Sequence, residues 1–179
     1  MQNYTDEFGY DIRGLKAYSG YFKDREKLKK SASGGMATAI AEQFIMSGGV
    51  VFGVRYSTDF RNAEFAMVDK IEDLELLKGS KYIDSIKKVL VGNKYVSIYK
   101  LVAKKLNNGF RVLFIGLGCD VAAIKKYCEF NKINTEQLFT IDLVCHGPTH
   151  PEVARQFLNN LEKRYKSQIT DFTVRFKRD

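Results

Sequence analysis

Two cysteines stand directly after apolar stretches that are typical of buried β-strands. Cys119 follows the run 112–117 and its Gly118, and Cys145 closes the run 138–144. Open α/β sheets hold their ligands at the carboxyl ends of central strands, so both thiols are candidates for binding or redox chemistry. A thiol at the start of a helix is also expected to have a lowered pKa, which makes it a better ligand or nucleophile than an ordinary cysteine. The alternative is that each cysteine is an inert core residue.

Other chemistry at these cysteines has less support. A Cys-His hydrolase built from Cys119 and His146 lacks an identifiable third group to orient the histidine, and it leaves the glycine-rich loops unexplained. The spacing of Cys119, Cys128 and Cys145 matches neither a zinc-finger nor a ferredoxin pattern. Cys128 lies within a predicted helix and is interpreted as a core residue.

Two glycine-containing loops carry residue types that bind anions. The first, 31–35, opens a predicted helix, where glycines admit a phosphate and the free N–H groups of the first turn attract it. In the second, 79–85, the charge of Lys81 and two serine hydroxyls suit a phosphate or a ribityl chain, and Tyr82 suits stacking on an aromatic ring. Taken singly, a capped helix start and a polar turn are the commoner explanations.

The elements that must position these residues are predicted from apolar spacing and from β-branched runs. The predicted helices span 36–46, 71–77, 95–106, 121–130 and 151–166, and the predicted strands span 15–22, 50–56, 63–68, 112–117, 138–144 and 169–176. This order predicts an α/β fold with a mixed central sheet and helices on both faces. We expect an irregular segment at 1–30 and one domain at 31–179. Because the chain stops at the last predicted strand, we expect that domain to be incomplete at its C-terminal end.

The composition is that of one folded domain. The chain has 179 residues, of which 45% are hydrophobic and 28% charged, a balance that argues against disorder. Three cysteines, no signal peptide and no membrane-length apolar stretch indicate a reducing, cytoplasmic setting without a membrane span. The net charge of +8 favours anionic partners. No motif interleaves basic and aromatic residues, so nucleic-acid binding is the less favoured hypothesis.

Five segments, in this order, resemble the beta subunit of coenzyme F420 hydrogenase/dehydrogenase. They are Ser33–Gly35, 48–53, 79–85, 112–119 and 142–147. The resemblance implies an iron–sulfur flavoprotein, a flavin-dependent oxidoreductase that binds FAD and a [4Fe-4S] cluster. Such a protein passes electrons between a hydride-carrying coenzyme, such as the deazaflavin F420, and the one-electron centres of a redox partner protein or ferredoxin.

The resemblance also implies roles by position. Ser33, Gly34 and Gly35 would cradle the FAD phosphates, Gly79, Ser80, Lys81 and Tyr82 would line the flavin, and Ser31, Ser85, Gly118 and His146 would complete the cofactor-binding set. Cys119 and Cys145 would be cluster ligands.

The sequence departs from the family pattern in ways that leave alternatives open. Gly118-Cys119-Asp120 stands where the family usually has Pro-Cys-Gln, and we expect the charge of Asp120 to make a neighbouring thiolate less stable. Pro148-Thr149-His150 stands where a Val-Pro-Ser type of sequence is usual. A cubane takes four cysteine ligands and the chain has three, so further ligands lie elsewhere or the cluster is lost. The alternatives are a non-catalytic nucleotide- or nucleic-acid-binding module and a diverged member without cofactors.

Overall fold

The computed structural model describes residue 14, residue 16 and residues 18–175. Its helices are α1 (Arg25–Lys30), α2 (Met36–Met46), the 3-10 helix η1 (Glu72–Leu77), α3 (Ile98–Asn107), α4 (Gly118–Phe130) and α5 (Pro151–Tyr165). Its strands are β1 (Val50–Tyr56), β2 (Ala63–Val68), β3 (Ser85–Ile86), β4 (Lys88–Val91), β5 (Lys94–Ser97), β6 (Val112–Leu117) and β7 (Leu138–Leu143).

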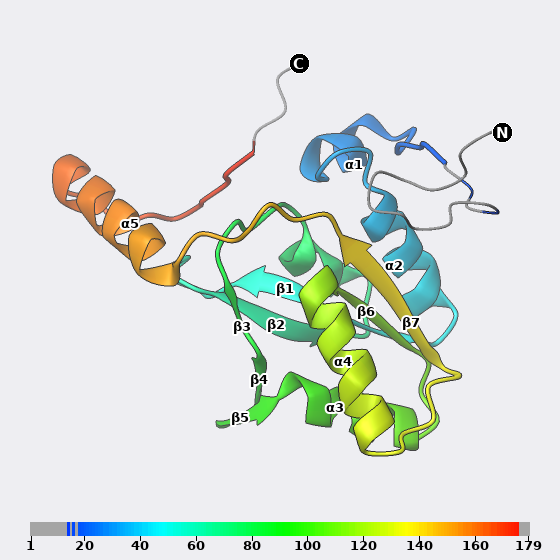
Figure 1. Ribbon diagram of the computed structural model, residues 1–179. Coiled ribbons are helices and arrows are strands. Elements are labelled where there is room, and N and C mark those ends of the chain that lie inside the picture. The colour runs from blue at the N-terminus through cyan, green and yellow to red at the C-terminus, as the bar shows by residue number, and fades with distance from the viewer. Residues whose placement is uncertain (1–13, 15, 17, 176–179) are drawn as a thin grey trace, which may run out of the picture.

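A five-stranded mixed sheet forms the centre of the molecule, in the order β3-β2-β1-β6-β7 (Figure 1). Strands β1, β6 and β7 are parallel, while β2 runs antiparallel to β1. The hairpin β1–β2 is closed by residues 57–62, and the parallel strands are joined by α3 and α4. Strands β4 and β5 form a separate antiparallel hairpin. The predicted α/β fold with a mixed sheet is therefore confirmed.

Helices cover both faces of this sheet because the central strands are apolar on both sides. Alternate residues of β6 serve the two cores: Val112 and Phe114 belong to one, and Leu113 belongs to the other. The first core packs against α3 and α4 and the second against α2 and η1. In the first core the rings of Phe65 and Phe114 stack at 5.2 Å.

Polar contacts join helix α5 to the β1–β2 turn, and the helix has one buried residue. Leu158 is fully buried. Arg61 in the turn donates to Asn159 at 2.9 Å and forms an ion pair with Glu162. His150 caps the N-terminus of α5, where its Nδ1 accepts from the backbone N–H of Glu152. Figure 1 shows α5 at one side of the molecule, after the loop that leaves β7.

Several element predictions are corrected by the structure. The segment expected to be irregular ends in α1, and residues 18–22 of the predicted edge strand at 15–22 form no strand. Residues 169–175 form no strand either, because no neighbouring strand pairs with them. The helix predicted at 95–106 begins only at Ile98. Among the residues described, no helix has the length and apolar character needed to cross a membrane.

Candidate functional site

The carboxyl ends of the parallel strands bring the two exposed cysteines to one edge of the sheet. Leu117 of β6 and Leu143 of β7 form the last pair of their ladder. Cys119 and Cys145 each lie two residues beyond that pair, and both are exposed. Helix α2 turns back into β1, so its N-terminus lies at this edge as well, beyond the arrowhead of β7 in Figure 1.

The first glycine loop meets this edge at the start of α2. Gly35 is the N-cap residue, with φ of 83°, and no side chain caps the helix. The first turn of α2 contains no acidic residue. The free N–H groups of this turn are therefore available to an anion. The role expected for Gly34 and Gly35 in binding phosphate stays a prediction.

The same loop is also packed tightly against the chain before it. A Cβ atom at Gly34 would lie 2.0 Å from the carbonyl oxygen of Gly20, and one at Gly35 would lie 2.4 Å from the Phe22 ring. The hydroxyl of Ser31 is buried and donates to the carbonyl of Lys27 at 2.7 Å. Ser33 is exposed, with φ of 50°. The glycines are thus required by the protein's own backbone, independently of any ligand.

Lys81 of the second loop caps the end of η1. Its side chain is buried, and its Nζ donates to the carbonyl oxygens of Leu77, Lys78 and Gly79 at 2.9, 2.6 and 3.1 Å. Burial lowers the pKa of Lys81 to about 8. The ammonium is therefore engaged with backbone acceptors, a role that no pattern in the sequence predicts.

We expect the free energy of unfolding to rise with pH between about 8 and about 10 because of Lys81. The unfolded chain carries the ordinary lysine pKa of 10.5 and the folded chain a pKa of about 8. In that window the unfolded chain binds more protons, so raising the pH favours folding, by about 1–2 kcal/mol. Urea denaturation at about pH 7.5 and about pH 9.5 measures the difference.

Two variants isolate this effect. Lys81→Met should abolish the rise, whereas Tyr56→Phe should keep it. Burial raises the pKa of Tyr56 to about 12 from 10.0, so its contribution has the opposite sign and begins only above about pH 10. An equal rise in Lys81→Met would contradict the assignment to Lys81.

Backbone hydrogen bonds join the second loop to the loop that carries Cys145. The N–H of Thr149 donates to the carbonyl of Tyr82 at 2.9 Å, and the N–H of Asp84 donates to the carbonyl of Thr149 at 3.1 Å. These bonds form a parallel bridge between Ile83 and Thr149. Tyr82 is exposed, with φ of 37°. The loop 79–85 and the loop that carries Cys145 are therefore neighbours.

Lys87 joins the second loop to the start of α4. Its Nζ donates to Ser85 Oγ at 2.8 Å and lies 2.8 Å from Asp120 Oδ1. The other carboxylate oxygen of Asp120 accepts from the N–H of Leu117 at 3.3 Å. Asp120 is buried, and its charge is compensated by Lys87. The sequence predicts that the charge of Asp120 makes a neighbouring thiolate less stable, and this stays a prediction; the structure adds that Asp120 has Lys87 as its counter-charge.

The cysteines differ in surroundings. Cys128 is fully buried in the core, as predicted, and burial raises its pKa. The Cys145 sulfur accepts from the N–H of Gly147 at 3.2 Å, and such bonds tune cluster-ligating sulfurs. His146 is exposed. Within the described part of the chain, no three Cys, His, Asp or Glu residues are grouped to hold a metal ion. The described residues therefore do not by themselves supply the four ligands that a [4Fe-4S] cluster takes.

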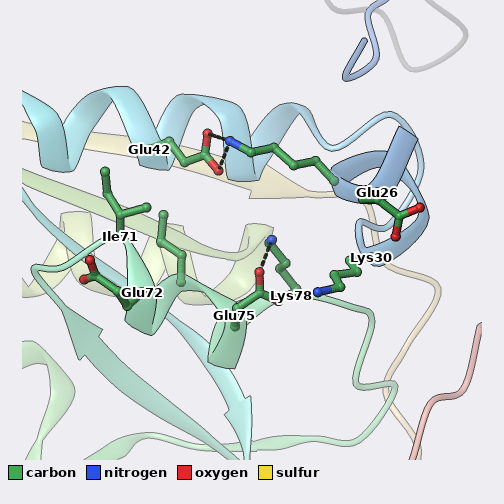
Figure 2. A pocket seen from close by; sticks show the side chains of 9 residues that line it. Glu26, Lys30, Glu42, Ile71, Glu72, Glu75 and Lys78 are labelled. Atoms are coloured by element: carbon green, nitrogen blue, oxygen red, sulfur yellow. Dashed lines mark hydrogen bonds and ion pairs between the residues drawn. The ribbon is translucent and has the colours of Figure 1, made fainter. Parts of the chain in front are cut away.

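A cavity of about 260 Å³ lies between α1, α2 and η1, on the side of η1 that faces α2. Its rim is charged and contains two ion pairs: Lys27 pairs with Glu42 at 2.8 Å, and Lys78 pairs with Glu75 at 2.6 Å (Figure 2). None of the site residues predicted from the sequence lines this cavity.

Sequence reasoning missed aromatic residues at this edge. Tyr56, the last residue of β1, donates its hydroxyl proton to the Lys81 carbonyl at 3.2 Å. Its ring lies edge-on to Phe172 at 5.7 Å, and Arg175 lies 3.5 Å from the Tyr82 hydroxyl. The segment after α5 therefore returns to the site. The position of Tyr56 at a strand end was a usable signal, whereas nothing in the sequence pointed to Phe172 or Arg175.

Comparison with known families shows to which family the chain belongs. The profile for the N-terminal part of the coenzyme F420 hydrogenase/dehydrogenase beta subunit matches residues 17–89, and the profile for its C terminus matches residues 109–178. The chain belongs to this family. No curated protein matches its sequence.

A solved structure shares the fold of this F420 hydrogenase/dehydrogenase beta-subunit chain. It is a chain in the F420-reducing [NiFe] hydrogenase complex from Methanosarcina barkeri, with a TM-score of 0.61 and 20% sequence identity. The similarity covers 87% of this chain and 52% of that chain. This chain therefore spans about half the length of its structural relative.

Proposed function

We propose that this chain is the FAD-binding part of an oxidoreductase that transfers electrons. The observation that carries the proposal is the placement of two loops and two cysteines at the carboxyl edge of β1, β6 and β7. The loops are 31–35 and 79–85, and the cysteines are Cys119 and Cys145. Family membership supports a redox role, and the solved relative is part of a hydrogenase complex that reduces F420. By analogy, the hydride-carrying coenzyme is F420 or a similar carrier, and the one-electron centres lie in a partner protein.

Several residues at the edge suit FAD. The uncapped N-terminus of α2 would bind a phosphate through its N–H groups. Gly118 would admit the cofactor to the start of α4, because a Cβ there meets no atom within 4 Å and its backbone does not otherwise need glycine. Tyr82 offers an exposed ring. When bound, FAD supplies a carrier that exchanges hydride with one partner and single electrons with another.

In the proposed electron transfer, the residues of this chain hold the cofactor and the loops around it in place. Backbone N–H groups bind and orient the cofactor, and Lys87 and Thr149 hold the surrounding loops together. Cys119 and Cys145 stay proposed as metal ligands, with the remaining ligands supplied from outside the described residues. No step is assigned to a cluster.

We expect the purified chain to take up FAD, and Gly118→Leu to weaken that binding at least about tenfold, since the new side chain would occupy the space left for the cofactor. Flavin fluorescence titration under anaerobic conditions measures the dissociation constant. Ala122→Leu is the matched control, because Ala122 is exposed on the same helix one turn further on. That variant should bind FAD within about twofold of the parent chain.

Two outcomes would count against the proposal. One is a colourless protein that takes up no flavin on reconstitution. The other is a Gly118→Leu variant that folds and binds FAD as well as Ala122→Leu does. That result would show that FAD does not bind at the edge of the sheet.

A further inference from the structure

The β4–β5 hairpin and α3 carry most of the excess positive charge of the chain. Residues 85–119 contain seven basic residues and no acidic residue, while the whole chain has a net charge of +8. The exposed members on the hairpin and α3 are Lys88, Lys94, Lys100 and Lys104. None of these four forms an ion pair with another residue that the structure describes.

Acidic residues of the neighbouring elements do not neutralise this surface. Glu64 of β2 is buried and pairs with Arg55 at 2.9 Å. Asp120 of α4 is buried and pairs with Lys87 at 2.8 Å. Both carboxylates are therefore already compensated, and the exposed lysines keep their charge toward solvent.

The outer face of the hairpin carries one exposed apolar pair. Leu90 pairs with Tyr95 across the two strands, and the next pair on this face is Lys88 with Ser97. The opposite face packs into the core through Val89. Leu90 is 48% exposed and Tyr95 58% exposed. No described residue covers this pair, so an aliphatic and an amphipathic aromatic side chain stand in water beside lysines.

The tip of the hairpin exposes a further aliphatic side chain. Val91, the last residue of β4, is 48% exposed and pairs with Lys94, on the face that also carries Val89. The turn between them consists of Gly92 and Asn93, neither of which is charged. In Figure 1 the hairpin lies at the far side of the molecule from α1. Residues 90–108 also lie between the two regions that the family profiles match.

We propose that the β4–β5 hairpin binds the surface of an anionic lipid membrane. Aliphatic side chains at a tip, a tyrosine whose ring is apolar and whose hydroxyl is polar, and lysines with long apolar stems suit the boundary between headgroups and acyl chains. Lysines near an anionic leaflet add electrostatic attraction. Stable interfaces between proteins favour arginine and are depleted in lysine, which argues against a protein partner. Surfaces that bind nucleic acids use basic and aromatic side chains, so nucleic-acid binding would not explain the exposed aliphatic side chains of Leu90 and Val91.

The test is co-sedimentation of the full chain with vesicles. We expect binding to phosphatidylcholine vesicles containing about one quarter phosphatidylglycerol, and at least about tenfold weaker binding to vesicles of phosphatidylcholine alone. Raising the salt from about 0.1 M to about 0.5 M should weaken binding several-fold, because it screens the lysines. The assay uses no flavin, so its result is independent of the function proposed above.

Variants separate the two contributions. Lys88→Glu with Lys94→Glu should weaken binding at least about tenfold, and Leu90→Ser with Val91→Ser about fivefold or more. The matched controls are Lys70→Glu and Met46→Ser, which change one exposed charge and one exposed apolar residue elsewhere and should stay within about twofold. All substituted side chains are exposed, and melting temperatures check that each variant folds.

The proposal would be overturned by the absence of binding to the anionic vesicles. Equal losses in the hairpin variants and the controls would overturn it too. A single-stranded polynucleotide that binds more tightly than the vesicles, and is lost with the same lysines, would assign the surface to nucleic acid instead.

Discussion

Gly34→Ala should lower the free energy of unfolding by about 3 kcal/mol, the upper end of what overpacking a tight contact costs. The added Cβ would lie 2.0 Å from the carbonyl oxygen of Gly20 and 3.2 Å from the Cα of Tyr21. Both neighbours are backbone atoms, so no side chain can rotate away. The two segments would have to separate, and the hydrogen bond from the Phe22 N–H to the Gly34 carbonyl, 3.0 Å long, would be lost.

Gly118→Ala is the matched control for this substitution. Gly118 does not have a positive φ, and an added Cβ meets no atom within 4 Å. Alanine is a better helix former, so this variant should be as stable as the parent chain or more stable by about 0.5 kcal/mol. Urea denaturation measures both, with an unchanged slope as evidence that the denatured state is the same.

Limited trypsin digestion adds a local readout, because the segment displaced by Gly34→Ala contains Lys23. Cleavage there should become faster in Gly34→Ala and stay unchanged in Gly118→Ala. A Gly34→Ala variant that unfolds at the same urea concentration as the parent and is cut no faster would show that the two backbones do not approach as closely as described.

The placement of the two strand-end cysteines at one edge of the sheet was predicted well, while their role as ligands stays a prediction. The uninterrupted apolar run 112–117 could only be a central strand, and the next apolar run, 138–144, follows one helix later. A strand, a helix and a strand in that order form a parallel pair, so Cys119 and Cys145 had to reach the same edge. The prediction followed from periodicity and topology alone.

Elements without strong periodicity were harder to predict. The β4–β5 hairpin has a Gly92-Asn93 turn between short strands, which is a hairpin signal that could have been found. Residues 95–97 of its second strand were instead predicted as the start of the helix that follows. The alternating residues at 169–176 satisfied the pattern of a strand, but a strand also needs a partner, and the structure gives residues 169–175 none.

Side-chain roles in the loops lay beyond sequence reasoning. The sequence Gly-Ser-Lys-Tyr is the same whether its lysine faces a phosphate or turns into the protein. Only the path of the backbone brings the carbonyl groups at the end of η1 to Lys81. The same holds for Asp120, whose partner is 33 residues earlier in the chain. Such long-range pairs produce no periodic pattern in the sequence.

Lys87→Met should lower the free energy of unfolding by about 2–3 kcal/mol, because it leaves the buried carboxylate of Asp120 without its counter-charge. The Asp120 side chain is only 3% exposed, while that of Lys87 is 33% exposed, so the expected loss is at the lower end for a broken buried pair. The contact from Lys87 to Ser85 Oγ would be lost as well. Lys88→Met, on the next and exposed residue, is the control and should change stability by no more than about 0.5 kcal/mol.

A double-mutant cycle decides whether the loss comes from charge or from packing. If the uncompensated carboxylate is the cause, replacing it in Lys87→Met/Asp120→Leu should recover at least about 1 kcal/mol, since two apolar side chains can substitute for a buried ion pair. If Lys87 acts only through the packing of its apolar stem, the second substitution should instead add its own loss to the first. Additive losses would therefore contradict a compensating role for Lys87, and with it the account of how an acidic residue is accommodated next to Cys119.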